Sequence, residues 1–133
     1  MADALFTEAE AAYLADQPLL RLATARPDGS RVDVAPLGFR FDGERFHLTG
    51  YDIAKTMKYF HIKANPHVAL VVDDLASVDP WTPRGVKVHG RAEVHTDAAG
   101  RSTIEVTPTR VWSWGLEAPA FGADGPIQRR AEA

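Results

Sequence analysis

The apolar run Val68–Val72 constrains the fold of this chain more than any other segment. It follows Asn65-Pro66, a pair that ends helices, and its length suits a strand better than a helix. Because every position of the run is apolar, both faces of this strand must be shielded from water. The sequence therefore predicts a central strand that is covered either by a helix or by a second subunit.

The segment before this strand is predicted to be a helix with lysines near its start. At about 100° per residue, Lys55 and Lys58 lie together, opposite an apolar stripe made of Ile53, Met57, Phe60 and Ala64. Free N–H groups, the helix dipole and an ammonium group at such a helix start suit a phosphate. Two observations point the other way. The lysines could simply solvate an exposed face, and Asp52 would cap the helix and repel an anion.

The remaining sequence alternates in the manner of antiparallel strands. A helix from Glu8 to about Asp16, introduced by the capping box Thr7–Glu10, precedes a strand over 19–25 and a turn over 26–30. In the next strand the apolar phase slips at Ala35-Pro36, which predicts a bulge or a sheet edge with free backbone groups. About six such strands and two short helices predict a small β-barrel.

Tryptophans and the last residues are the other informative features. Trp81 lies in a proline-stiffened loop, and exposed tryptophans often mark ligand or subunit contacts. Trp112 and Trp114 share a face of the last strand, where core packing explains them equally well. From Ala118 the chain is rich in Ala, Gly and Pro, which predicts a flexible tail over 118–133 after a domain over 1–117.

Composition excludes several classes of function. The chain of 133 residues suits one domain, and the lack of cysteine rules out disulfides, thiolate nucleophiles and cysteine-based zinc sites. A net charge of -3 without a basic block argues against nucleic acid, and no apolar run suits a membrane span, so a cytoplasmic protein is expected. The histidines stand in no metal-ligand spacing, so no metal site is predicted, and no set of catalytic side chains is recognisable. An enzyme with this sequence would rely on a cofactor.

Taken in order, several motifs resemble the pyridoxamine 5'-phosphate oxidase-like split-barrel family, in particular its actinobacterial branch of coenzyme F420-dependent oxidoreductases. The likeness extends from residue 5 to about 116. Its carriers are the segments 20–29, 34–39, 54–56, 65–72, 84–93 and 110–115. The resemblance implies a six-stranded antiparallel split β-barrel with short flanking helices, the FMN-binding split barrel.

The resemblance also implies a partner and a cofactor site. Members are homodimers that bind a flavin or deazaflavin at the subunit interface, which would cover the second face of Val68–Val72. Pro36, Leu37 and Gly38 would meet the ring, and Thr49, Lys55 and Thr56, with Lys58 close by, would hold the phosphate. With the tryptophan of the stiff loop added, the candidate cofactor-binding residues are Pro36, Leu37, Gly38, Thr49, Lys55, Thr56, Lys58 and Trp81.

Two departures from the family pattern bear on the cofactor. Ile53 stands where some relatives carry an arginine, and Lys58 stands where an asparagine can occur. Substrate-phosphate residues of full pyridoxamine phosphate oxidases are not found here. An additional lysine beside the phosphate suits the acidic lactyl-glutamate tail of F420 better than FMN, which ends at its phosphate.

The function that the resemblance implies is hydride transfer between F420 and a small organic acceptor, such as a quinone, an enone or a polyketide-like molecule. One alternative keeps the fold and uses FMN, as an oxidase or flavin reductase. Another is a non-catalytic protein that carries a deazaflavin or a tetrapyrrole.

Overall fold

The computed structural model describes residues 4–50 and 52–133. Its helical elements are α1 (Glu8–Asp16), a short 3-10 turn η1 (Ile53–Lys55) and α2 (Met57–Ala64). The strands are β1 (Leu19–Ala25), β2 (Val32–Phe41), β3 (Phe46–Thr49), β4 (His67–Ser77), β5 (Thr82–Thr96), β6 (Ser102–Trp114), β7 (Phe121–Gly122), β8 (Gly125–Pro126) and β9 (Arg129–Glu132). No helix within these residues is long and apolar enough to cross a bilayer.

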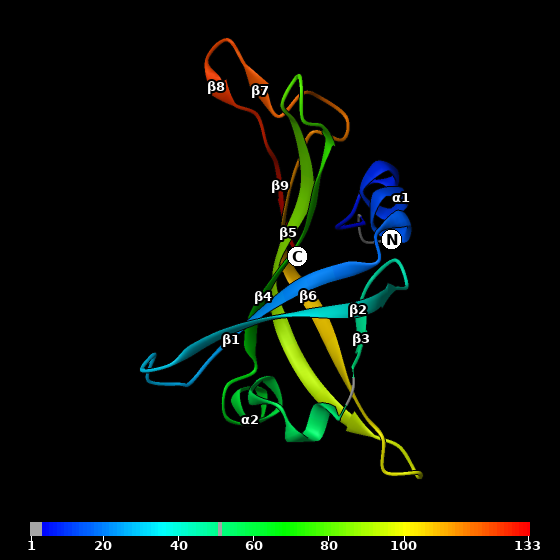
Figure 1. The fold of residues 1–133 in the computed structure, drawn as a ribbon, viewed down its shortest axis with the longest axis vertical. Helices are drawn as coiled ribbons and strands as arrows, with labels where there is room; N and C mark the ends of the chain where they lie inside the picture. The colour runs from blue at the N-terminus through cyan, green and yellow to red at the C-terminus, as the bar shows by residue number, and fades with distance from the viewer. Residues whose placement is uncertain (1–3, 51) are drawn as a thin grey trace.

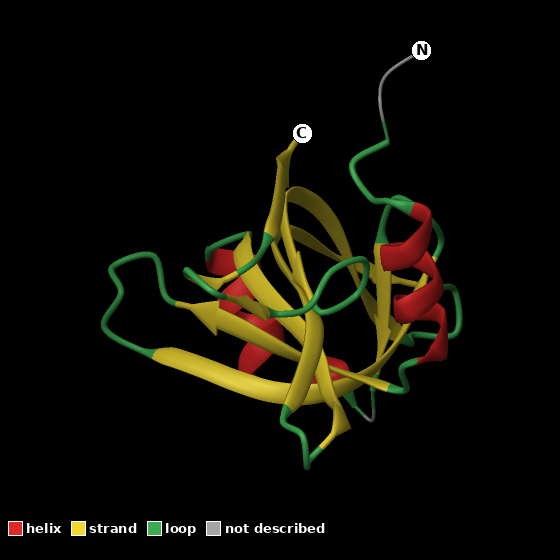
Figure 2. Cartoon of the chain, turned by 90° about the horizontal axis from the view of Figure 1, so that it is seen from above, coloured by secondary structure: helices red, strands yellow, loops and turns green. Residues whose placement is uncertain are grey.

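The predicted barrel is confirmed. Strands are ordered β3-β2-β1-β4-β5-β6 and all pair antiparallel, and pairing of β3 with β6 closes the ring. Figure 1 shows α1 beside the upper part of the barrel and α2 below it, and Figure 2 shows the curved strands around the interior. The interior is filled by side chains that alternate inward along the strands, among them Leu20, Leu22, Phe46, Leu48, Leu70, Val72, Val86, Val88, Ile104 and Val106.

The apolar run 68–72 lies in β4, and its side chains alternate between the core and the outer face of the barrel. Val68, Leu70 and Val72 point into the core and are buried, whereas Ala69 and Val71 lie on the outer face and are only half-buried. Within the described residues, no helix covers this outer face, so the chain by itself leaves it partly exposed to water.

The predicted bulge in β2 is wrong, whereas the alternative of a sheet edge is correct. β1 and β2 pair without a break from Leu19–Gly38 to Ala25–Val32. The phase slip arises because Val32 and Val34 point outward and are 75% and 66% exposed, while Leu37 points into the barrel. β3 pairs with β2 only from Gly38 onward, so the first half of β2 lies at an edge of the sheet.

The predicted apolar stripe of the lysine helix is also wrong. Met57 and Phe60 are 42% and 59% exposed, and the side chains that α2 buries are His61 and Ile62. His61 Nδ1 lies 2.9 Å from Thr24 Oγ1, which joins α2 to β1. The prediction assumes one continuous helix with about 100° between successive residues. Thr56 has extended backbone angles and separates η1 from α2, so Ile53 and Met57 do not lie on one face of a single helix.

The C-terminal segment differs from the predicted tail. β9 pairs with the last part of β6, from Arg110–Glu132 to Ser113–Arg129, and β7 and β8 form a small hairpin. Arg129 binds Glu10, a fully buried carboxylate, at 2.8 Å, and Glu10 also completes the capping box of α1. The segment is therefore joined to both the barrel and the first helix, which composition does not reveal.

Candidate functional site

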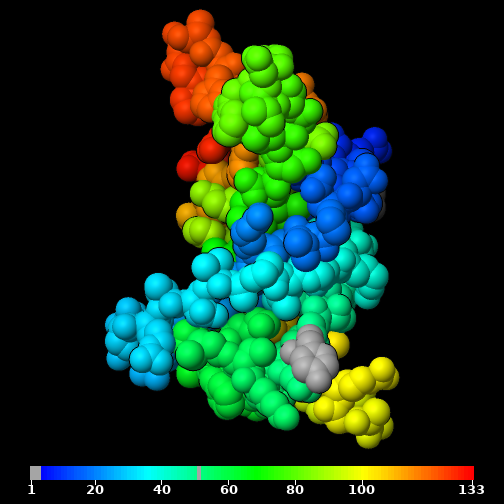
Figure 3. Space-filling model, in the orientation of Figure 1, coloured from blue at the N-terminus to red at the C-terminus, as the bar shows by residue number. Residues whose placement is uncertain are grey.

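A cavity of about 600 Å³ opens on the outer surface at the end of β3. It lies between η1 and the β5–β6 turn, the green and yellow projections at the lower end of Figures 1 and 3. Two predicted cofactor residues meet there, since Thr49 and Lys55 both line it. The other lining residues are Gly50, Asp52, Ile53, Ala54, Asp97, Gly100, Arg101, Ser102 and Thr103.

The chain turns sharply on its way from β3 to α2. Asp52 has a left-handed backbone with φ of 47° and makes no side-chain cap, which contradicts its predicted role as the cap of the lysine helix. The Thr56 hydroxyl donates to the Ile53 carbonyl at 2.6 Å and is therefore engaged with the backbone. This turn points Lys55 toward the cavity, whereas Thr56 and Lys58 are not among its lining residues.

The start of α2 retains the features expected of an anion site. Its N-cap residue Thr56 provides no side-chain hydrogen bond to the first turn, and that turn contains no acidic residue. The first N–H groups of the helix thus receive no side-chain cap, and the positive end of the helix dipole is not offset locally. Lys58, half-buried, stands in this turn.

The charges around the cavity are mixed. Arg101 Nε pairs with Asp97 at 3.3 Å, and Asp52 contributes a second carboxylate. Among the described residues, Lys55 has no ion-pair partner, so its ammonium group is available to a ligand. Arg101 is a candidate that the sequence does not reveal, because it comes to the cavity from a distant turn.

The predicted ring site adjoins this cavity. Gly38 on β2 lies directly opposite Thr49 on β3, and a Cβ atom added at Gly38 would meet no atom within 4 Å. Pro36 is exposed on the same outer face, whereas Leu37 points into the core. The side chain of Leu37 is therefore unavailable to a ligand on this outer face, and only the backbone there can contribute.

Trp81 lies far in space from the other predicted cofactor-binding residues. It stands in the turn between β4 and β5, which Figure 1 places beside β7 and β8 at the end opposite α2. Trp81 is 63% exposed and lines cavities of about 400 and 350 Å³ together with Pro83 and Phe121. Within one copy of the chain, Trp81 cannot share a ligand with Thr49 and Lys55.

A further hollow of about 460 Å³ lies on the outer face of β1, β4, β5 and β6. Its floor includes Ala23, Ala69 and His89, and Val32 stands at its margin. Beside it, the Lys87 ammonium lies 4.3 Å from the ring centre of Trp112. Burial, together with the positive charges of Lys87 and Arg110, lowers the pKa of His89 below its ordinary value, so the imidazole favours its neutral form beside these two cations.

Comparison with known proteins agrees with this architecture. The family model for pyridoxamine 5'-phosphate oxidase matches residues 6–115. A 5a,11a-dehydrotetracycline/5a,11a-dehydrooxytetracycline reductase of Streptomyces rimosus is 35% identical, and the match covers 84% of each chain.

Solved structures give the same result for the fold. An F420 reductase superposes with a TM-score of 0.63 at 29% identity, over 80% of this chain and 98% of that one. A conserved hypothetical protein of Mycobacterium tuberculosis superposes with a TM-score of 0.69 at 23% identity, over 88% and 89% of the two chains. With most of the barrel matched in both sequence and structure, this chain belongs to the pyridoxamine 5'-phosphate oxidase family.

Proposed function

We propose that this protein is a reductase that uses coenzyme F420 to reduce a small conjugated organic acceptor. The observation that carries the proposal is the cavity in which Thr49 and Lys55 meet beside Gly38. The reductase from Streptomyces rimosus and the structurally similar F420 reductase both support an oxidoreductase. A deazaflavin cofactor is consistent with the name of the F420 reductase.

The donor set of the cavity fits a phosphate. Lys55 offers an ammonium group without an ion-pair partner among the described residues, Thr49 offers a hydroxyl, and Arg101 stands on the opposite wall. A volume of about 600 Å³ is within the range of ligand sites. Asp52 and Asp97 also line the cavity, and Asp97 pairs with Arg101, so Lys55 is the cation that we propose meets the phosphate.

The cofactor, when bound, supplies the hydride. The residues of this chain would bind and orient it: Lys55 and Thr49 would hold the phosphate, and the surface without a side chain at Gly38 would receive a flat ring. In this proposal the residues of the chain bind and orient the cofactor for hydride transfer, and no side chain near Gly38 is assigned as an acid or a base.

Positive charge beyond the phosphate favours F420 over FMN. Lys58 stands in the first turn of α2, and Arg31 is exposed at the β1–β2 turn, which projects on the other side of α2 in Figure 3. An acidic lactyl-glutamate tail could run between these cations, whereas FMN has no group that reaches them.

The outer face of the sheet supports a homodimer. Val32 and Val34 are highly exposed, and Val34 lies across the strands from Ala23 and Ala69. Exposed apolar side chains that are grouped in this way are typical of subunit contacts. A second copy seated there would cover the outer face of β4 and could bring its own residues near the cofactor of the first.

The proposed acceptor is a quinone, an enone or a polycyclic polyketide-like molecule. This class follows from hydride chemistry, since a conjugated carbon–carbon double bond accepts a hydride at one end and a proton at the other. The relative from Streptomyces rimosus is named for a reaction on dehydrotetracyclines, which supports the polyketide-like member of this class.

A titration with two cofactors tests the proposal. Untagged protein is titrated with F420 and with FMN while the absorbance of each ring is followed, and the oxidation of reduced F420 is then measured with a quinone and with an enone. We expect tighter binding of F420 and turnover of at least one acceptor. Tighter FMN binding without F420 turnover would instead favour an FMN oxidase or flavin reductase. F420 binding without turnover of any acceptor would favour the carrier alternative.

A further inference from the structure

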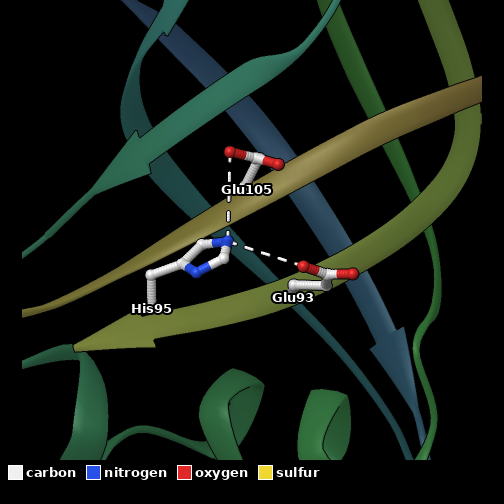
Figure 4. A group of neighbouring side chains, drawn as sticks. All are labelled: Glu93, His95 and Glu105. Atoms are coloured by element: carbon white, nitrogen blue, oxygen red, sulfur yellow. Dashed lines mark ion pairs between the residues drawn. The ribbon is translucent and has the colours of Figure 1, made fainter.

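A cluster of histidines and carboxylates lies on the outer face of the barrel seam, where β3, β6 and β5 run side by side. Glu93 and His95 come from β5, and Glu105 comes from β6. Figure 4 shows their side chains directed toward one another above the strands. One ligand atom from each of the three lies within 4.8 Å of the others.

The separations within this cluster are too long for hydrogen bonds. His95 Nε2 is 3.6 Å from Glu93 Oε2 and 3.9 Å from Glu105 Oε2, whereas hydrogen bonds of this type measure about 2.7–3.2 Å. Two ligands that share a tetrahedral zinc ion, each about 2.0–2.2 Å from it, lie roughly 3.3 Å apart. The cluster is thus spaced so that a small cation could bridge its members after slight side-chain rotation.

His47 on β3 lies next to Glu105, but its ring nitrogens are not among the ligand atoms that lie within 4.8 Å of one another. Its Nε2 lies 2.7 Å from Asp42 Oδ2, and its Nδ1 faces Glu105 Oε2 at 3.9 Å. When the ring donates Nε2–H to Asp42, the lone pair on Nδ1 is free to bind a metal. A carboxylate that orients a histidine in this way is the usual outer shell of a metal site.

The strand register also places like charges together. Glu93 and Glu105 are direct cross-strand partners in the β5–β6 ladder, an arrangement that is unfavourable for two carboxylates. Arg45 Nε lies 3.7 Å from Glu105 Oε1 and offsets part of that charge, but the other carboxylate oxygen, Oε2, faces the two histidines. A divalent cation at this point would remove the repulsion.

From this geometry we propose a zinc-class divalent metal site formed by His95, Glu105 and Glu93, which His47, oriented by Asp42, would complete by moving toward the three. Two imidazoles and two carboxylates match the borderline character of Zn²⁺ and do not suit Mg²⁺ or Ca²⁺, which prefer oxygen ligands. The site would link β3, β5 and β6 across the pairing that closes the barrel.

The proposed metal site lies next to the candidate cofactor cavity. Thr49 lies two residues after His47, and Thr103 is the cross-strand partner of His95, and both threonines line the candidate cofactor cavity. A metal bound at the seam would therefore hold two walls of that cavity in place and stabilise the folded chain, because the unfolded chain lacks the assembled ligand set.

The test uses untagged full-length protein and zinc alone. After treatment with a chelator, zinc binding is measured by calorimetry and the melting temperature is recorded with and without zinc. We expect one zinc per chain and a rise in melting temperature for the original protein. Glu105→Gln and His95→Ala should abolish both effects, and Asp42→Asn should weaken binding roughly 10- to 100-fold.

His89→Ala is the matched control, since His89 lies on the same outer face of β5 but outside the cluster. It should retain the stoichiometry and the rise in melting temperature. Circular dichroism of each variant checks folding, and His95→Gln replaces His95→Ala if the latter does not fold. The proposal is overturned if the original protein shows no saturable zinc binding, or if the cluster variants bind zinc as well as His89→Ala does.

Discussion

Gly38 of β2 lies directly opposite Thr49 of β3, on the outer face of the barrel. The proposed ring site at Gly38 is therefore next to the cavity, lined by Thr49, where the phosphate is proposed to bind. A residue without a side chain leaves the surface between them open, because a Cβ atom there would contact nothing within 4 Å. A side chain added at Gly38 should therefore affect binding of the proposed ligand without disturbing the fold.

Substitution of Gly38 should harm binding without harming the fold. Gly38→Ala has space for its methyl group and should raise stability by about 0.4–1 kcal/mol, because the unfolded chain loses conformational freedom. Gly38→Val should weaken F420 binding more than Gly38→Ala, since its larger side chain covers the proposed ring surface. Thermal unfolding and cofactor titration measure the two effects. Unchanged F420 affinity of Gly38→Val would contradict the ring site.

Removal of the cavity lysine should weaken cofactor binding in a salt-dependent way. Lys55→Ala should cost roughly 1.5–3 kcal/mol of binding free energy, the range of a hydrogen bond to a charged group, with little loss of stability. The difference from the original protein should shrink as salt rises past about 0.1 M, where the Debye length is about 10 Å.

Lys63→Ala is the control for Lys55→Ala. Lys63 lies on the exposed side of α2, with its ammonium group 5.4 Å from the ring centre of Tyr59, and does not line the cavity. Its removal should leave cofactor affinity unchanged. Equal losses of cofactor affinity in the two variants would mean that neither lysine contacts the phosphate and that both act only through the general positive charge of an exposed surface.

The sequence predicts the barrel well because strand alternation and turn residues are local signals. It predicts the helix incorrectly, since the break at Thr56 and the left-handed Asp52 interrupt a pattern that assumes one regular helix. Thr49 and Lys55 could be brought together only through the family resemblance. Arg101 and the histidine–carboxylate cluster depend on the register of strands distant in sequence, for which no short motif exists.

A charge on the apolar outer face should dissociate the proposed dimer. Val34→Asp costs the single chain little because the side chain is 66% exposed, but it would bury a carboxylate between two subunits. Light scattering should show a dimer for the original protein and a monomer for Val34→Asp. Val78→Asp is the control, since Val78 is 70% exposed in the β4–β5 turn, away from this face, and should remain dimeric. A monomeric original protein at micromolar concentration would contradict the interface.

The ion pair between Arg129 and Glu10 should decide whether the C-terminal segment stays on the barrel. Glu10 is fully buried and accepts hydrogen bonds from the Thr7 backbone, the Ser113 hydroxyl and Arg129. Arg129→Ala would leave this carboxylate without its cation, at a cost of roughly 2–3 kcal/mol, below the usual range for buried pairs because about a third of the Arg129 side chain reaches water. Hydrogen exchange should then accelerate in β9 and at the start of α1.

Arg130→Ala is the control, because Arg130 is an exposed neighbour on β9, and it should leave both protection from exchange and stability unchanged. Rapid exchange of β9 in the original protein would show instead that the segment is flexible, as its composition predicts.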